Sequence, residues 1–535
     1  MRQIHSSAWL LCLFSAGLQI LIFPLPNLYM LCWVAITPLL VALLRARVPS
    51  TLQLNAGIKL LPAKPVQGFV LGYVCGIVWY AGSCYWIYPT MRQYGGLNAP
   101  TAFGTLILFS LYLAFYHGAF GLGVSLLAGE SPFSRRALLI SPFLWVAVEL
   151  ARTRISGFPW DLLGITQVDN VALVHVSRVT GVYGVSFEIM VVNAALAAAF
   201  LLARLRVGRE RWRSLLLASV IAMAVLQTGR WINPEALIGD RTARLVQQNI
   251  PVLEGSEWTN EYSEGTLRDL TWLSLNLAGN QGGRVDLIVW PESPAPFYST
   301  DPVFRGTLSS IARQSQAWVL AGSLGIRNAS ETPERATQVY NSGNLINPQG
   351  EWVARYDKVH LVPFGEYVPF KRVFGFAGGL TKEVGDFLPG GSRAPLVAGD
   401  AKLGVFICYE SIFPDEIRQF VANGAQVIVN ISNDGWYGDS GAYAQHLRQA
   451  RMRAVENARW LLRDTNTGVT AVIDPYGRIV ASAPRKMRTA LEANYGLSNV
   501  TTFYTRHGDW FAYLCAIISV AALVMRFAIR RRAEN

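Results

Sequence analysis

Long apolar segments fill much of the first 229 residues of this chain and return once near its carboxyl end. A helix that crosses a lipid bilayer needs about 20 mostly apolar residues, so segments of this length restrict the possible folds strongly. The candidate segments are residues 8–25, 28–44, 67–88, 103–128, 137–151, 181–203, 213–229 and 510–527. The sequence therefore predicts a polytopic α-helical membrane domain with about eight transmembrane helices, of which 137–151 is the shortest candidate.

Between the last two of these segments lies a stretch of ordinary globular composition. The whole chain is only 15% charged, whereas soluble proteins usually carry about a quarter charged residues. Charged residues nevertheless occur throughout 230–509. We therefore predict three parts: a membrane domain with seven transmembrane helices at 1–229, a globular domain at 230–509, and a last transmembrane helix with a basic tail at 510–535.

Arginine supplies much of the net charge of +12, and it clusters beside the apolar segments. The clusters lie at 45–47, 135–136, 204–213 and 526–532. This distribution is typical of residues that set membrane topology, so the charge is not evidence for nucleic-acid binding. With a cytoplasmic amino terminus, all four clusters and the carboxyl terminus lie in the cytoplasm. The globular domain is then extracytoplasmic, which in a bacterium means periplasmic.

Strand-like and helical runs alternate through the globular domain. The strand-like runs are 243–250, 286–293, 318–326, 340–358, 402–411, 425–434 and 468–480, and the helical runs are 302–315, 413–423 and 443–458. Several strand-like runs are continuous Val, Ile and Leu that stop at polar residues, as strands buried on both faces do. The pattern predicts a layered α/β fold with its functional site at the ends of strands.

Three of these runs end at a residue suited to catalysis. Glu292 can act as a general base, and Lys358 can stabilise an oxyanion. Cys408 is the only cysteine between 230 and 509, and a nearby ammonium or helix amino terminus would lower its pKa and favour the nucleophilic thiolate. Taken singly, each residue also has an ordinary explanation: a capping glutamate, a solvated strand end and an inert buried cysteine.

The motifs around these residues are more specific than the residues alone. WPES at 290–293, YDKVHLVPFGEYVP at 356–369 and CYES at 408–411 resemble the nitrilase superfamily of carbon–nitrogen hydrolases, which implies an αββα sandwich with a Glu-Lys-Cys triad. The chain as a whole resembles the membrane-embedded branch, the apolipoprotein N-acyltransferase family. FPW at 158–160, NDGWYG at 433–438, QHLRQARMRAVENAR at 445–459 and TNTGVTAVID at 465–474 carry this narrower resemblance.

The resemblance implies a role for each triad residue. Cys408 would be the nucleophile, Glu292 the general base and Lys358 the oxyanion stabiliser. The expected substrate-binding or supporting residues are Glu366, Tyr409, Glu410, Trp258, Asn341, Asn433 and Trp436. No cofactor is expected. No metal site is expected either, because His360 and His446 are isolated along the chain.

The resemblance also implies a reaction and a cellular location. An acyl chain would pass from a phospholipid, expected to be the sn-1 chain of phosphatidylethanolamine, to a cysteine thioester. It would then pass to the α-amino group of the N-terminal S-diacylglyceryl cysteine of an apolipoprotein, the last step of bacterial lipoprotein maturation. The expected partners are the phospholipid donor, the diacylglyceryl apolipoprotein acceptor and inner-membrane lipids, with no nucleic acid. We expect a monomer in the bacterial inner membrane.

Three other functions stay open. A membrane-anchored amidase or nitrile hydrolase would use the same triad with water, although eight helices are more than an anchor needs. A non-catalytic partner, for example of a polyprenol-phosphate mannosyltransferase, would not need an intact triad. A transporter would place charged residues within the membrane, where Glu149 and Glu188 are the notable candidates.

Overall fold

The computed structural model divides the chain into two compact units. One unit comprises Met1–Tyr88, Asn98–Asn233 and His507–Asn535, and the other comprises Pro89–Leu97 and Pro234–Arg506. The structure describes residues 4–49, 60–131, 133–205, 209–232, 234–252, 257–276, 284–293, 296–327, 338–367 and 387–534. The sequence did not indicate that Pro89–Leu97, which lies between two predicted membrane spans, belongs with the globular unit.

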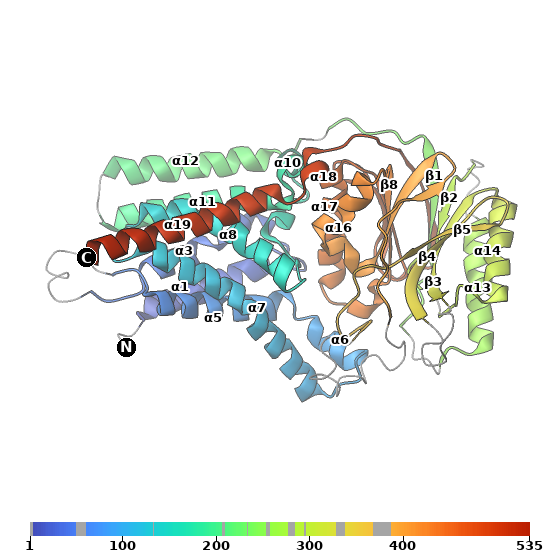
Figure 1. Ribbon diagram of the computed structural model, residues 1–535, viewed down its shortest axis with the longest axis horizontal. Helices are drawn as coiled ribbons and strands as arrows, with labels where there is room; N and C mark the ends of the chain where they lie inside the picture. Colours follow the sequence, from blue (N-terminus) through green and yellow to red (C-terminus); the bar gives the residue numbers. More distant parts are fainter. Residues whose placement is uncertain are drawn as a thin grey trace. The chain divides into compact units, whose positions relative to one another are not determined.

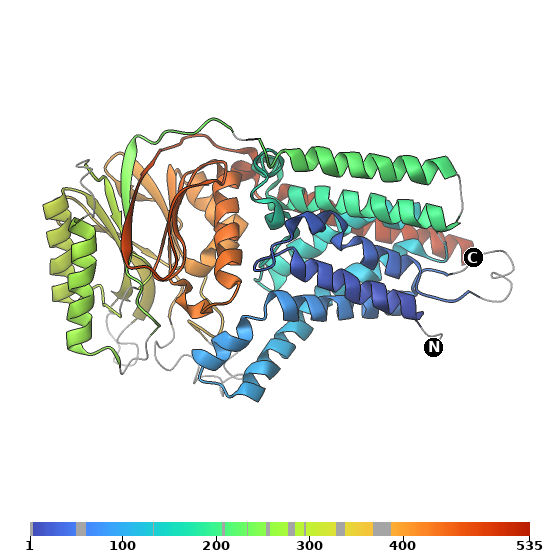
Figure 2. The same cartoon turned by 180° about the vertical axis from the view of Figure 1, so that it is seen from behind.

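The first unit is built from helices, with isolated bridges that pair Arg47 with Ile4 and Leu61, and its long helices run side by side (Figures 1 and 2). Its helices are α1 (Ser6–Leu21), η1 (Tyr29–Leu31), α2 (Cys32–Ala35), α3 (Thr37–Leu44), α5 (Pro65–Ser83), α7 (Ala99–Ala128), α8 (Arg135–Ile155), η2 (Leu163–Gln167), α9 (Val171–Val174), α10 (Ser177–Thr180), α11 (Val182–Leu205), α12 (Arg209–Thr228) and α19 (Trp510–Glu534). Helix α6 (Ile87–Gln93) begins in this unit, and its residues from Pro89 onward belong to the other.

Four described helices are long and apolar enough to cross a membrane: Pro65–Ser83, Ala99–Ala128, Val182–Arg204 and Trp510–Ile529. The other four predicted spans are helical but differ from that pattern. The first, α1, has only 16 residues, and the span 28–44 is broken into η1, α2 and α3. Helix α8 carries five charged residues, and α12 opens with four within its first five positions. The count of eight crossings therefore stays a prediction.

Glycines bring α5 and α7 into close contact. A Cβ atom added at Gly72 would lie 2.2 Å from the His117 carbonyl oxygen, and one at Gly121 would lie 2.2 Å from the Gly68 carbonyl oxygen. Small residues that let two backbones approach this closely are typical of helix pairs in membranes. The glycine spacing therefore accounts for the pairing of these two helices.

The second unit contains two six-stranded sheets. Their orders are β12-β1-β2-β3-β4-β5 and β11-β10-β9-β8-β7-β6. The strands are β1 (Arg241–Gln247), β2 (Leu287–Val289), β3 (Trp318–Arg327), β4 (Gln338–Ile346), β5 (Trp352–Asp357), β6 (Leu396–Ala398), β7 (Ala401–Ile407), β8 (Val427–Ser432), β9 (Leu461–Thr465), β10 (Thr470–Ile473), β11 (Ile479–Ala483) and β12 (Thr489–Tyr495). In each sheet three neighbouring strands are parallel, β1-β2-β3 in one and β7-β8-β9 in the other.

Helices cover the outer faces of the two sheets. Helices α13 (Asn260–Leu275) and α14 (Pro302–Ser315) cover the first sheet, and α16 (Pro414–Ala422) and α17 (Ala442–Asn457) cover the second (Figures 1 and 2). The short elements η6 (Cys408–Ile412), η7 (Asp434–Tyr437) and α18 (Phe503–His507) complete the unit. The layers run helix, sheet, sheet, helix, so the predicted nitrilase-like α/β sandwich is confirmed.

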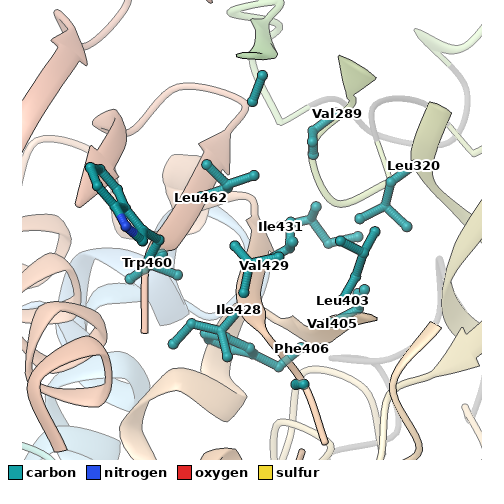
Figure 3. Packing of buried hydrophobic residues seen from close by; sticks show 14 of the residues in the cluster. Val289, Leu320, Leu403, Val405, Phe406, Ile428, Val429, Ile431, Trp460 and Leu462 are labelled. Atoms are coloured by element: carbon teal, nitrogen blue, oxygen red, sulfur yellow. The ribbon is translucent and has the colours of Figure 1, made fainter. Parts of the chain in front are cut away.

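A hydrophobic core fills the space between the sheets. Figure 3 shows Val289 and Leu320 of the first sheet packed toward Val405 and Ile431 of the second. All six residues of β8 are buried, as expected for a strand covered on both faces. Polar residues at the ends of such strands are therefore held on a rigid frame.

Candidate active site

Four buried polar side chains meet at the ends of strands in the first sheet. Glu292 follows β2, Asn341 lies on β4, Lys358 directly follows β5, and Glu366 lies in the segment after it. The Lys358 Nζ atom lies 2.9 Å from Glu366 Oε1 and 3.4 Å from Glu292 Oε1. Asn341 Nδ2 donates to the same two carboxylate oxygens, at 2.8 Å each. We call these four residues the lysine cluster.

Backbone N–H groups hold the remaining carboxylate oxygens of the lysine cluster. Glu292 Oε2 accepts a hydrogen bond of 2.8 Å from the N–H of Asn433, and Glu366 Oε2 accepts one of 2.8 Å from the N–H of Val362. Burial opposes the charged form of Lys358, but the carboxylates of Glu366 and Glu292 outweigh it and raise its pKa above the usual range. The lysine is therefore an ammonium ion fixed between two glutamates.

Cys408 lies at the carboxyl end of β7 and begins η6. Its backbone has a φ of +49°, in the left-handed region that few residues other than glycine adopt. Its side chain is buried, and burial, together with the nearby Glu292 carboxylate, raises the pKa of the thiol despite the opposing effect of Lys358. The expectation of a lowered pKa was wrong, because the local cues carried no information about burial or about Glu292.

Glu410 connects the turn that carries Cys408 to the segment that carries Lys358. Its Oε1 atom accepts hydrogen bonds from the Tyr356 hydroxyl at 2.7 Å and from the N–H groups of Val359 and His360 at 2.8 and 3.0 Å. Its Oε2 atom accepts from the Ile407 N–H at 2.7 Å. Burial outweighs these hydrogen bonds and raises the pKa of Glu410 to about 7.

A second buried group of charged residues contacts the backbone of Cys408, and sequence reasoning missed it. It consists of Asp434 in η7, His446 in α17 and Arg463 in β9, all almost fully buried. We call these three residues the histidine cluster. The sequence signal was weak, because His446 looked isolated and its partners come from separate elements.

The two predicted tryptophans have different surroundings. Trp436 is 39% exposed, its carbonyl accepts from Thr90 Oγ at 3.1 Å, and its ring contacts the Tyr94 ring edge-on. Trp258 instead contacts Tyr262 and packs on the hydrophobic cluster between the first sheet, α13 and α14. Its ring and core contacts therefore do not join it to the lysine cluster in the described part of the chain.

The two remaining predicted residues are Tyr409, which follows Cys408, and Asn433, whose N–H donates to Glu292. Tyr409 is buried and its ring contacts Phe413 edge-on at 5.3 Å between centroids. The Asn433 side chain accepts from the Gly435 N–H at 3.1 Å and from Asn466 Nδ2 at 3.2 Å, which holds the backbone that donates to Glu292. Among the described residues, no group of three or more His, Cys, Asp or Glu side chains is arranged to hold a metal ion.

Two family models match the chain. The model "Apolipoprotein N-acyltransferase N-terminal domain" matches residues 15–195, and "Carbon-nitrogen hydrolase" matches residues 242–503.

Similar proteins match over most of their length. "Apolipoprotein N-acyltransferase" of Geobacter metallireducens is 35% identical, with 98% of this chain and 96% of the relative covered. The protein of the same name from Methylococcus capsulatus is 36% identical, with 88% and 90% covered. Among solved structures, an amidase of the nitrilase superfamily from Nesterenkonia is 20% identical, covers 52% of this chain and 96% of its own, and has a TM-score of 0.36.

Proposed function

The chain belongs to the apolipoprotein N-acyltransferase family, which makes it an acyltransferase of lipoprotein biosynthesis, and we propose the substrates and the mechanism that follow. The donor is a phospholipid, namely phosphatidylethanolamine through its sn-1 acyl chain. The acceptor is the α-amino group of the S-diacylglyceryl cysteine at the amino terminus of an apolipoprotein. The product is a triacylated lipoprotein, and the transfer is a ping-pong reaction through a thioester on Cys408.

One observation carries the mechanism: a buried thiol within electrostatic reach of an ammonium ion that two glutamates hold in place. A thiol with a raised pKa is protonated at neutral pH, so it needs a base before it can attack. Glu292 is the lysine-cluster carboxylate that acts on the thiol electrostatically. Glu292 therefore acts as the base, and Lys358 is free to stabilise negative charge on the substrate.

In the first half-reaction, Glu292 takes the proton of the Cys408 thiol as the sulfur attacks the ester carbonyl carbon. The Lys358 ammonium and backbone N–H groups next to Cys408, including that of Tyr409, stabilise the tetrahedral oxyanion. The carbon–oxygen ester bond then breaks, and the leaving oxygen receives the proton from Glu292. Lysophospholipid departs, and Cys408 carries the acyl chain as a thioester.

In the second half-reaction, the neutral α-amino group of the apolipoprotein attacks the thioester carbonyl. Glu292 accepts a proton from the attacking amine, and the same donors stabilise the second oxyanion. The carbon–sulfur bond breaks as the amide forms, and the departing sulfur takes the proton back from Glu292. The enzyme returns to its starting state without a metal or an organic cofactor.

Glu366 and Asn341 act as positioning residues in this scheme. Glu366 holds the Lys358 ammonium at 2.9 Å, and Asn341 bridges Glu366 and Glu292 through its amide nitrogen. Fixed donors of this kind do not need to reorganise as charge develops in the transition state. Both residues therefore affect the rate through the position of Lys358 and Glu292.

The proposed location is the bacterial inner membrane. Four apolar helices of membrane-spanning length support membrane association. Both substrates carry acyl chains, so a site at the outer face of that membrane would receive them without complete extraction from the bilayer. We propose that both termini are cytoplasmic, that the globular unit is periplasmic and that Trp436 lies near the lipid interface.

The test compares wild-type protein with Cys408→Ala and with Cys515→Ser, a control that removes a cysteine of α19. Each protein receives phosphatidylethanolamine and a synthetic diacylglyceryl lipopeptide, and mass spectrometry follows the lipopeptide and the enzyme. We expect wild type and Cys515→Ser to add one acyl chain to the α-amine through a thioester on Cys408. Equal transfer by Cys408→Ala would overturn the mechanism. No transfer, with release of ammonia from small amides, would favour the hydrolase.

A further inference from the structure

The backbone at Cys408 adopts a conformation that its own side chain disfavours. A φ of +49° in a residue other than glycine persists only where surrounding contacts over-determine it. The Ile407 N–H, one residue before, donates to Glu410 Oε2 at 2.7 Å. On the following side, the Cys408 carbonyl oxygen lies 3.0 Å from His446 Nε2. The strained residue is therefore held by a buried side chain on each side.

The hydrogen bond to the Cys408 carbonyl also fixes the orientation of the N–H group of the next residue. In a planar trans peptide, the C=O of one residue and the N–H of the next point in opposite directions. When His446 holds the Cys408 carbonyl, it therefore also sets the direction of the Tyr409 N–H. That N–H belongs to the backbone that would stabilise the oxyanion in the proposed mechanism.

His446 is itself held rigidly. Its Nδ1 atom lies 2.9 Å from Asp434 Oδ1, and Arg463 Nη2 lies 2.8 Å from Asp434 Oδ2 and 3.1 Å from Oδ1. The Ser432 hydroxyl also donates to Asp434 Oδ1 at 2.9 Å. Burial alone would raise the pKa of Asp434, but Arg463 and His446 hold it below its usual range, so the carboxylate is ionised.

The partners of Nε2 indicate that this nitrogen carries a hydrogen. The Cys408 carbonyl can only accept a hydrogen bond, so the Nε2 atom must carry a hydrogen to make this contact. The Ser411 hydroxyl, 2.7 Å from the same nitrogen, can rotate to accept as well. His446 therefore acts on Cys408 through a hydrogen bond to its backbone carbonyl.

We propose that His446 is a positioning residue for acyl transfer, which orients the peptide unit between Cys408 and Tyr409 through its hydrogen bond to the Cys408 carbonyl. Asp434 and Arg463 hold the ring in place for this role. The inference rests on the proposed function of Cys408 as nucleophile. It adds a requirement to that function: the Tyr409 N–H must keep a fixed orientation relative to the Cys408 thiol.

Two substitutions that place an amide side chain at position 446 test this proposal. In His446→Gln the side-chain amide nitrogen can reach the place of Nε2, whereas in His446→Asn it reaches only the place of Nδ1. A displacement of about 1 Å at reacting groups can cost about 100-fold in rate, so we expect His446→Asn and His446→Ala to lose about 100-fold in kcat. We expect His446→Gln to stay within about tenfold of wild type, with the KM for the lipopeptide similar in all three variants.

Wild-type protein is the positive control and Cys408→Ala the negative control of the assay. The thermal unfolding midpoint of each variant is also measured. Equal kcat values for His446→Asn and His446→Gln would overturn the inference, and so would a kcat for His446→Ala within about threefold of wild type. Rate losses that match the fraction of unfolded protein would overturn it too, since the role would be structural only. Transfer by Cys408→Ala has a different meaning, because it would refute the proposed function itself.

Discussion

The lysine cluster and the histidine cluster are both buried and charged, yet they relate to Cys408 in different ways. In the lysine cluster two carboxylates share one ammonium ion, and Glu292 and Lys358 both act on the thiol electrostatically. In the histidine cluster one carboxylate is paired with an arginine and helps to raise the pKa of the thiol, and the imidazole donates to the Cys408 carbonyl. In the proposed mechanism the lysine cluster supplies the base and the oxyanion stabiliser, and the histidine cluster supports the backbone of Cys408.

The difference shows that burial and charge do not define a catalytic group by themselves. The lysine cluster contains two carboxylates and one ammonium ion. Glu292 can therefore exchange a proton while Lys358 remains paired with Glu366. In the histidine cluster, Arg463 Nη2 contacts both oxygens of the ionised Asp434 carboxylate, and His446 donates to the Cys408 carbonyl. Substitutions in the two clusters should therefore affect different measured quantities.

The largest effect should follow the loss of the proposed base. Glu292→Gln keeps an oxygen that can accept from Asn341 but removes the ability to take a proton, and general base catalysis contributes about 100- to 10,000-fold. We expect kcat for lipopeptide acylation to fall by that amount, while the thermal unfolding midpoint stays close to that of wild type. A loss of less than about tenfold would show that another group is the base.

Arg463→Met should damage the fold more than the chemistry. Removing one partner of a buried ion pair leaves an uncompensated charge and costs about 3–5 kcal/mol of unfolding free energy. Arg268→Met is the matched control, because Arg268 and Glu264 are both 69% exposed and such pairs contribute under about 1 kcal/mol. Chemical denaturation measures both, and similar losses for the two variants would contradict the distinction between the clusters.

Lys358→Met should lower the rate by about 100- to 1000-fold, the usual cost of losing one oxyanion donor. The substitution also leaves Glu292 and Glu366 without their shared cation, so Glu366→Gln in the same chain should restore part of any lost stability. Acylation kinetics and unfolding curves of the single and double variants separate the two effects. A Lys358→Met enzyme with wild-type kcat would remove the lysine from the mechanism.

The pH dependence of thiol alkylation tests the protonation state of Cys408. Because its pKa lies above the usual value, the thiolate fraction should rise about tenfold for each pH unit near neutrality. Iodoacetamide labelling of Cys408, followed by mass spectrometry, should therefore accelerate without a plateau between about pH 6 and about pH 8. Since Lys358 opposes the raised pKa, the curve of Lys358→Met should shift to higher pH. A plateau below about pH 7 would indicate a resting thiolate.

The smallest effect should come from Tyr94, whose ring contacts Trp436 edge-on at 5.5 Å between centroids. Such aromatic pairs contribute about 0.5–1.5 kcal/mol, so Tyr94→Leu should lower kcat by about 2- to 10-fold if the contact positions the backbone that donates to Glu292. Trp436→Leu should cause a similar loss, and the double variant should lose little more. Additive losses would show that the two residues act independently.

Sequence patterns predicted those site residues that have a reactive side chain and also follow a predicted strand. Glu292, Lys358 and Cys408 each follow a run of strand-forming residues, and such runs end at one edge of a layered sheet. The family resemblance also implied Asn341 and Glu366; Glu366 contacts the Lys358 ammonium ion, and Asn341 donates to Glu366. The continuous apolar strands predicted a layered α/β fold, and the resemblance to the nitrilase superfamily implied its αββα order.

Sequence patterns could not predict contacts between elements that are brought together only by packing. His446 lies on a helix, Asp434 in a turn and Arg463 on a strand, and no spacing along the chain links their side chains. The segment Pro89–Leu97 belongs to the globular unit for the same reason.

The sequence by itself determined which residues could react and on which kind of fold they would lie, because residue type and periodicity are local properties. It determined the long apolar segments in the same way, four of which are helices of membrane-spanning length. Only the tertiary structure decided the protonation state of Cys408 and the position of its backbone. Both depend on burial and on partners distant in the sequence, Glu292 for the thiol and His446 for the carbonyl.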